Sequence, residues 1–292
     1  MLSGTSVSHV RQGLGKAFSK DQVAGYYNDF TAKVDMQPEL LETTELPMLE
    51  TASGHKVYFP VEVFQYGFGA YDLFLLTADR RYHVKFMQTV TWTMQNQQED
   101  GSWNNFFFIY PSHPYGAMAQ GEGASLLLRA YSETKDEKYL ISARKALDFM
   151  LKPIQEGGTT EYSDQGLVLM EYTHRPTVLN GWIFAWWGLY DYMQTTGEHG
   201  KYYEAMEASC KALITSLPAF STWYWSNYDL GGRIASPHYQ IIHIAQLQAM
   251  YQLTGLSPFA EYANLWADYQ KKPLNKSIAF IKKAYQKIIE RE

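Results

Sequence analysis

The stretch LNGWIFAWWGLYDYMQTT, residues 179–196, is followed after a short polar turn by YYEAMEASCKALITSL, residues 202–217. The first segment is apolar almost throughout and contains small residues, whereas the second carries more charge. A helix that is apolar all round packs inside a domain, and an amphipathic helix covers it. The two segments therefore predict a helical hairpin with one inner and one outer helix.

The same pattern occurs four times from residue 66 onward, and a threonine marks the end of each more apolar segment. These threonines are Thr77, Thr134, Thr196 and Thr254, at intervals of 57, 62 and 58 residues. The turns read TADRRY, TKDEKY, TGEHGKYY and TGLSPF, so an aromatic residue opens each second segment. A nearly fixed interval indicates copies of one structural unit. We therefore expect an all-α fold, an α/α toroid (an incomplete barrel) of four helical hairpins.

The residues before the repeats are weakly patterned. We expect an N-terminal arm over residues 1–60 and the toroid over residues 61–292, with a short helix around residues 20–30. The stretch HKVYFPVEVF, residues 55–64, is rich in β-branched and aromatic residues, so the arm can contain a small β element. Pro60 argues against a central strand there.

The composition is globular but rich in aromatic residues. Apolar residues make up 46% of the 292 residues, enough for a sizeable core, and the 23 Tyr and 8 Trp bring the aromatic share to 16%. Rings with polar tips often line sugar-binding grooves, although most of these rings can equally be core. The net charge of −5 gives no general attraction to nucleic acid or to anionic lipid, so we expect neither nucleic acid nor membrane as a partner.

Cysteine use and the first residues bear on the compartment. Cys210 is the only cysteine, which excludes internal disulfides and fits a reducing environment. The start, MLSGTSVSHVRQGLGKAF, lacks the apolar run of a secretion signal, and no stretch is apolar enough to span a bilayer. The sequence predicts a cytoplasmic location of bacterial type.

Motifs for metals and cofactors are missing. His238 and His243 are five positions apart in a helical context and do not share a face, so we expect no metal. The GEG of AQGEGA lies at a helix start and is interpreted as close helix packing, not as a phosphate loop. No GxSxG signature is present, and we expect no cofactor.

The connections between hairpins must all lie at one end of such a ring. They are long, covering about residues 101–115, 155–177 and 219–238. Long loops at one end of a rigid scaffold are the usual place for a binding cleft. The second connection ends in the polar stretch EYTHRP, and the third contains WYWSNYDLGGR and SPHYQ.

Five motifs together resemble one known family. YFPVEVFQYG, YGAMAQGEGASLLLRAY, RPTVLNGWIFAWWGLYD, NYDL and HYQIIHIAQLQ look like the C-terminal catalytic region of the D-glucuronyl C5-epimerases, over about residues 57–270. These enzymes convert D-glucuronic acid to L-iduronic acid in heparosan, so the resemblance implies an anionic, heparosan-like polysaccharide as partner. Larger members have a β-rich N-terminal region, and any groove wall that it supplies must here come from residues 1–60 or from the second subunit of a homodimer.

The resemblance assigns the catalytic candidates one at a time. The family's functional tyrosines match Tyr172, Tyr228 and Tyr239, and the carboxylate before the first of them matches Glu171. Inversion at C5 needs a base on one face of the sugar and an acid on the other. We expect Tyr239 on one face and Tyr172 or Glu171 on the other, with Tyr228 positioning the substrate or relaying a proton. For each tyrosine the alternative is a buried ring with a satisfied hydroxyl.

Removal of the C5 hydrogen adds negative charge next to a carboxylate, and preorganised donors must stabilise it. The VLNG asparagine of the family matches Asn180, and the cation is Arg175 or Arg233. The family places its arginine directly after YDL, whereas this chain reads YDLGGR and has Arg233 two residues later. The full set of substrate-binding candidates is Asn180, Arg175, Arg233, His238, Gln120 and Tyr66.

Three other functions stay open. A polysaccharide lyase begins with the same proton abstraction but expels the C4 oxygen. A glycoside hydrolase needs two carboxylates that flank the bond, and Glu171 with Asp229 is the pair available for it. A glycan-binding helical-repeat protein would hold the polymer without catalysis.

Overall fold

The computed structural model describes residues 10–51, 54–164 and 166–289. Four antiparallel helical hairpins dominate it, and this confirms the expected all-α toroid. The hairpins are α2 (Pro60–Thr77) with α3 (Arg80–Gln95), α4 (Ala117–Thr134) with α5 (Glu137–Met150), α6 (Leu179–Thr196) with α7 (Lys201–Ser216), and α8 (Pro237–Thr254) with α9 (Ser257–Lys271).

Each inner helix ends at its marker threonine. The Thr77 hydroxyl donates to the carbonyl of Leu73 and accepts from the backbone N–H of Asp79. The same two bonds form at Thr134, Thr196 and Thr254. The residue after each threonine then takes a left-handed conformation, which ends the helix. The threonine repeat is therefore a repeated helix stop.

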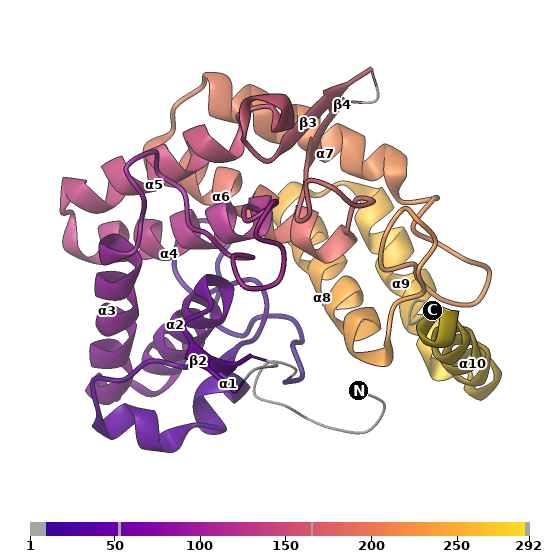
Figure 1. Cartoon of the computed structure of the whole chain (residues 1–292), viewed down its shortest axis with the longest axis horizontal. Coiled ribbons are helices and arrows are strands. Elements are labelled where there is room, and N and C mark those ends of the chain that lie inside the picture. The colour runs from indigo at the N-terminus through magenta and orange to yellow at the C-terminus, as the bar shows by residue number, and fades with distance from the viewer. Residues whose placement is uncertain (1–9, 52–53, 165, 290–292) are drawn as a thin grey trace.

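The inner helices follow one another around a curved ring in the order α2, α4, α6, α8, and each outer helix packs on its inner partner (Figure 1). The ring is open between α8 and α2. Helices α4 and α6 approach closely, because a Cβ atom on Gly121 would come within 2.5 Å of the Cα of Ala185. This confirms the interpretation of GEG as a close-packing motif.

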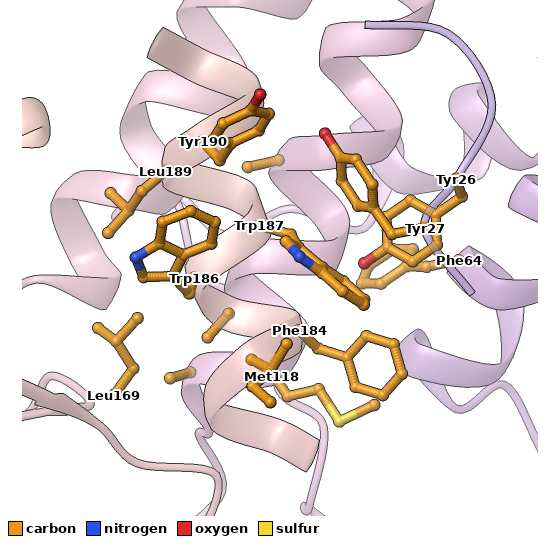
Figure 2. Close-up of a cluster of buried hydrophobic side chains, with 14 of the residues drawn as sticks. Tyr26, Tyr27, Phe64, Met118, Leu169, Phe184, Trp186, Trp187, Leu189 and Tyr190 are labelled. Carbon is orange, nitrogen blue, oxygen red and sulfur yellow. The ribbon is translucent and has the colours of Figure 1, made fainter. Parts of the chain in front are cut away.

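Part of the N-terminal arm lies inside the ring (Figure 2). The Tyr26 ring stacks on Phe68 of α2 at 3.7 Å between centroids, and Tyr27 contacts Trp187 of α6 at 4.8 Å. The helix expected around residues 20–30 is wrong, since the short helix α1 lies at Thr31–Asp35. The backbone around Tyr26 and Tyr27 bonds to other segments instead of to itself, because the Tyr26 N–H donates to the Asp72 carboxylate at 2.9 Å and the Tyr27 carbonyl accepts from the Gly15 N–H at 2.8 Å.

A buried ion pair ties the arm to the ring. Arg129 of α4 lies 2.7 Å from the carboxylate of Asp191 on α6, and both side chains are fully buried. The Tyr27 hydroxyl donates to Asp191, and Arg129 donates to the carbonyl of Gly25 at 3.0 Å. The arm and the four hairpins therefore share one core.

The remaining elements are small or peripheral. The arm contains the 3-10 helix η2 (Pro38–Glu42) and an antiparallel pair of strands, β1 (Leu49–Glu50) and β2 (Lys56–Val57), so the expected β element is confirmed. The sequence did not predict η2, nor did it predict η3 (Ile154–Glu156), the hairpin of β3 (Thr160–Ser163) with β4 (Gly166–Leu169), or α10 (Pro273–Ile289), which packs on α9. Within the residues described, no helix combines the length and apolarity needed to cross a bilayer.

Candidate active-site cleft

A cleft of about 380 Å³ opens where the inner helices begin, which is the end of the ring with the long connections. Five residues predicted from the sequence line it: Glu171, Tyr172, Asn180, His238 and Tyr239. Gln12, Leu49 and Glu50 of the arm also line it, so residues 1–60 supply part of the wall within a single chain.

Two glycines make room for Glu171. A Cβ atom on Gly116, just before α4, would lie 2.2 Å from the Glu171 carbonyl oxygen, and one on Gly181, in the first turn of α6, would lie 2.2 Å from Glu171 Oε2. The Glu171 side chain is thus held between two helix starts. Only 7% of the residue is exposed, and Oε2 has no hydrogen-bond partner among the described residues.

Aromatic rings hold Tyr172. Its ring stacks on Phe106 of the first connection at 4.7 Å between centroids and meets the edge of Tyr110 at 5.8 Å. The guanidinium of Arg175 lies 4.5 Å from the Tyr110 ring centre and 5.7 Å from that of Tyr172. Arg175 is therefore beside the site, against the rings, and does not line the cleft.

Backbone pairing brings Tyr228 to the other two tyrosines. The Leu179 N–H donates to the carbonyl of Tyr228 at 3.2 Å, and the Leu230 N–H donates to that of Thr177 at 3.0 Å. The third connection thereby runs alongside the start of α6. The Tyr228 ring then lies 4.7 Å from that of Tyr239, at the start of α8.

The ionisable groups of the site act on one another's pKa values. Glu171 influences Tyr172, Tyr172 influences Tyr228, and Tyr228 influences Tyr239, through polar atoms that lie close together. Burial raises the pKa of Glu171 to about 7, although the Tyr172 hydrogen bond and the positive charge of Arg233 both act to lower it. A carboxyl group with this pKa gains and loses its proton near neutral pH.

The pKa values of the three tyrosines are raised, which makes these side chains poor bases near neutral pH. Burial, followed by the charge of Glu171, raises the pKa of all three phenols, that of Tyr239 to about 12. At neutral pH these tyrosines are therefore neutral proton donors, whereas Glu171 is the group able to accept a proton.

Arg233 and Asp229 form an ion pair, in which the Asp229 side chain is fully buried. The Arg233 guanidinium also lies 5.5 Å from the Tyr228 ring centre. Neither residue lines the cleft. A hydrolase would need Asp229 free opposite Glu171, so this geometry counts against the hydrolase alternative.

Gln120 and Tyr66 lie elsewhere, in the core. Gln120 is fully buried, and its amide bonds the backbone N–H and carbonyl of Trp103, each at 3.0 Å, which holds the first connection. Tyr66 is also fully buried. Neither residue lines the cleft, so the expectation that they contact substrate has no support from their placement.

Sequence reasoning missed two residues of the same motif that do line the cleft, Glu62 and Gln65 of α2. Glu62 pairs with the buried Lys33, and Gln65 donates to Glu122 of α4 at 3.0 Å. The signal was present in YFPVEVFQYG, where two polar residues three apart share one face of an otherwise apolar inner helix.

A cleft that binds an anionic polymer is expected to present lysine or arginine side chains. Among its described lining residues there is no lysine or arginine, and Arg129 and Arg144 bond to partners elsewhere. Within the described ranges, no group of three or more His, Cys, Asp or Glu side chains could hold a metal ion.

Comparison with known proteins places most of the chain in one sequence family. Residues 87–268 match the family model of the D-glucuronyl C5-epimerase C-terminus. An uncharacterised protein of Methanocaldococcus jannaschii is 31% identical over 159 residues, covering 52% of this chain and 51% of that protein. The D-glucuronyl C5-epimerase of Caenorhabditis elegans is 28% identical over 223 residues, covering 66% of this chain and 36% of that enzyme. The chain thus spans about half of one relative and about a third of the other.

Solved structures share the fold. The GH76A alpha-1,6-mannanase of Salegentibacter sp. HEL1_6 superposes with a TM-score of 0.55 at 14% identity, over 86% of this chain and 80% of that one. The unsaturated glucuronyl hydrolase of Bacillus sp. GL1 gives 0.52 at 12% identity, over 82% and 65%. At such identities the likeness concerns the α/α toroid architecture alone.

Proposed function

The chain belongs to the D-glucuronyl C5-epimerase C-terminus family, and from this membership we propose that it converts D-glucuronic acid to L-iduronic acid in a heparosan-like polysaccharide. The family match and the nematode homologue support a C5-epimerase-like function in general. The observation that supports the specific reaction is the gathering of Glu171, Tyr172 and Tyr239 in the lining of one cleft, with Tyr228 behind them, its ring 4.7 Å from that of Tyr239.

Glu171 is the proposed base. Its pKa of about 7 matches the pH at which a general base is most effective, and no described residue offers a hydrogen-bond partner to its buried Oε2. The C5–H bond of the uronate breaks as the proton moves to Glu171, and the electron pair remains on the sugar as an enolate of the carboxylate. The Asn180 side chain, which lines the cleft next to Glu171, is the proposed donor to that enolate.

Tyr239 is the proposed acid. It comes from α8 and thus from a different element than Glu171, and its neutral phenol has a proton to give to C5 from the other face. Between turnovers, exchange with water returns a proton to Tyr239 and removes the one held by Glu171, so that each new C5 hydrogen comes from solvent. No group leaves the sugar, and the net change is inversion at C5.

The decisive experiment is incubation with heparosan in deuterated water, followed by NMR of the uronic acid. We expect deuterium at C5 and an iduronate signal. Tyr239→Phe should lose the iduronate signal and Glu171→Gln should lose both, each with the fold unchanged by circular dichroism. Tyr203→Phe on the outer helix α7 is a matched control that should retain full exchange. Absence of exchange with authentic polymer would contradict the proposal.

The same incubation separates the epimerase from the lyase alternative. A lyase would expel the C4 oxygen, giving an unsaturated product that absorbs ultraviolet light and a shorter polymer. We expect neither. A non-catalytic glycan-binding protein would bind heparosan and give no exchange.

A further inference from the structure

Helix α10 lies at the edge of the molecule, next to α9 and outside the ring of hairpins (Figure 1). One side of it is fixed to the protein. Ala279 is buried in a small apolar cluster with residues of the third connection. The Gln286 amide bonds the N–H of Ile234 and the carbonyl of Gly232, each at 3.0 Å, and Lys283 Nζ donates to the carbonyl of Ile234 at 2.9 Å. The helix is therefore held in place with its other side turned to solvent.

The solvent-facing side of α10 is largely apolar. Six of its large apolar residues are between 48% and 70% exposed: Leu274, Phe280, Ile281, Tyr285, Ile288 and Ile289. At about 100° per residue, all but Ile289 fall within an arc of about 140°, and Ala279 lies on the opposite side of the helix. A contiguous exposed apolar patch of this kind marks a surface that contacts a partner or a membrane.

Lysines border the apolar face on both sides. By the same spacing, Lys276 and Lys287 lie along one edge of the arc, next to Phe280, and Lys282 lies along the other edge, beyond Tyr285. The helix contains no aspartate or glutamate. An apolar face bordered by lysines is the pattern of a helix that lies in the plane of a lipid–water interface, where the lysine stems reach the headgroups.

The charge of the chain is unevenly distributed. Residues 273–292 carry four lysines and one arginine against two glutamates, a net charge of +3, whereas residues 1–272 carry −8. The expectation of no membrane partner used the charge of the whole chain, which conceals this local excess. A second copy of the chain fits the face less well, because two-fold pairing would bring the lysines of two such helices together. An anionic bilayer supplies both an apolar layer and negative charge.

We propose that α10 binds the surface of an anionic lipid bilayer, with Ile281 and Ile288 at the level of the acyl chains and the bordering lysines at the headgroups. The helix lies outside residues 87–268, which match the family model, so the family match gives no account of this surface. The inference is also independent of the proposed function, because lipid binding is measured without any sugar.

The test is sedimentation of the full chain with vesicles of phosphatidylcholine and phosphatidylserine, or of phosphatidylcholine alone. We expect at least about tenfold tighter binding to the anionic vesicles, since each lysine near such a surface contributes about fivefold. Lys276→Gln with Lys282→Gln should weaken this binding about tenfold or more, and so should a rise in salt concentration. Ile281→Ser with Ile288→Ser should also weaken it at least about tenfold, because the apolar face is lost.

The matched control replaces two exposed apolar residues on other outer helices. Val84→Ser on α3 with Ile141→Ser on α5 should bind the anionic vesicles as tightly as the native chain. Circular dichroism and deuterium exchange on heparosan should be unchanged in the serine pair on α10, which shows that the loss concerns lipid binding and not the fold. If that pair does not fold, the glutamine pair decides the question.

Three results would overturn the inference: no binding to either vesicle, equal binding to both, or full binding by the substituted α10. Analytical ultracentrifugation tests the other occupant of this face. A native dimer that becomes a monomer in the serine pair, with no vesicle binding, would assign the face to a second copy of the chain instead of to lipid.

Discussion

The carboxyl group of Glu171 lies against the backbone of Gly181, so closely that a methyl group on Gly181 would come within 2.2 Å of Oε2 and 2.6 Å of the Glu171 Cβ. The clash reaches the root of the Glu171 side chain, so a change of rotamer at its far end does not relieve it. Gly181 is the glycine of the VLNG motif, and its lack of a side chain fixes where the proposed base stands.

Gly181→Ala should therefore disable catalysis by displacing Glu171. We expect the exchange rate to fall by about a hundredfold or more, since a shift of about 1 Å in a catalytic group is enough for such a loss. Overpacking of this kind costs about 1 to 3 kcal/mol of stability, and the better helix propensity of alanine offsets about 1 kcal/mol of it, so the variant should stay folded while its rate falls. Gly200→Ala, where no atom lies within 4 Å of the added Cβ, is the control and should keep full activity.

Glu171→Gln should stabilise the protein in a pH-dependent way. Burial raises the folded-state pKa to about 7, so the native chain binds an extra proton relative to the unfolded one and loses stability as pH rises from the ordinary glutamate range to about 7. The neutral amide avoids that loss, by about 1 to 3 kcal/mol at pH 8 and by little at pH 4. Thermal unfolding of both proteins from pH 4 to 8 measures the difference, and a constant offset would contradict a titrating Glu171.

The pH dependence of exchange should follow the same group. If Glu171 accepts the C5 proton, the rate rises with pH through about 7 and then levels, because the phenols stay protonated in this range. A rate that falls through pH 7 would instead make the protonated carboxyl group the essential form. The initial rate of deuterium incorporation across pH 5 to 9 decides between them.

The ring of helical hairpins could be predicted because each helix end is marked by residues that are close together in the sequence. Thr77 and its three equivalents stop their helices through bonds within six residues, so each copy of the repeat carries its own boundary. The path of the arm could not be predicted in this way. Tyr26 and Tyr27 are placed by contacts with α2, α4 and α6, and such distant partners leave no periodic trace in the arm itself.

The residues of the candidate site also differ in whether the sequence could identify them. Glu171, Tyr172 and Tyr239 stand in motifs that a family resemblance identifies, and the structure brings them to one cleft. Tyr66 and Glu62 stand in the same motif, but Glu62 lines the cleft whereas Tyr66 is buried in the core, because position on the helix decides which side chain faces the cleft. Side-chain direction in α2 depends on how the helix is rotated against its neighbours, which the motif alone does not give.

The buried pair of Arg129 and Asp191 should be the most sensitive ionic contact for stability. Asp191→Ala leaves Arg129 as an uncompensated buried charge and removes the acceptor of the Tyr27 hydroxyl, at a cost of about 3 to 5 kcal/mol. Arg129→Met combined with Asp191→Leu removes both charges and should recover most of that loss. The exposed pair of Lys271 with Asp268 is the control, and Asp268→Asn should leave the melting temperature unchanged. Equal destabilisation by the single and double changes would mean that the hydrogen bonds to the arm, and not the charges, hold it in the ring.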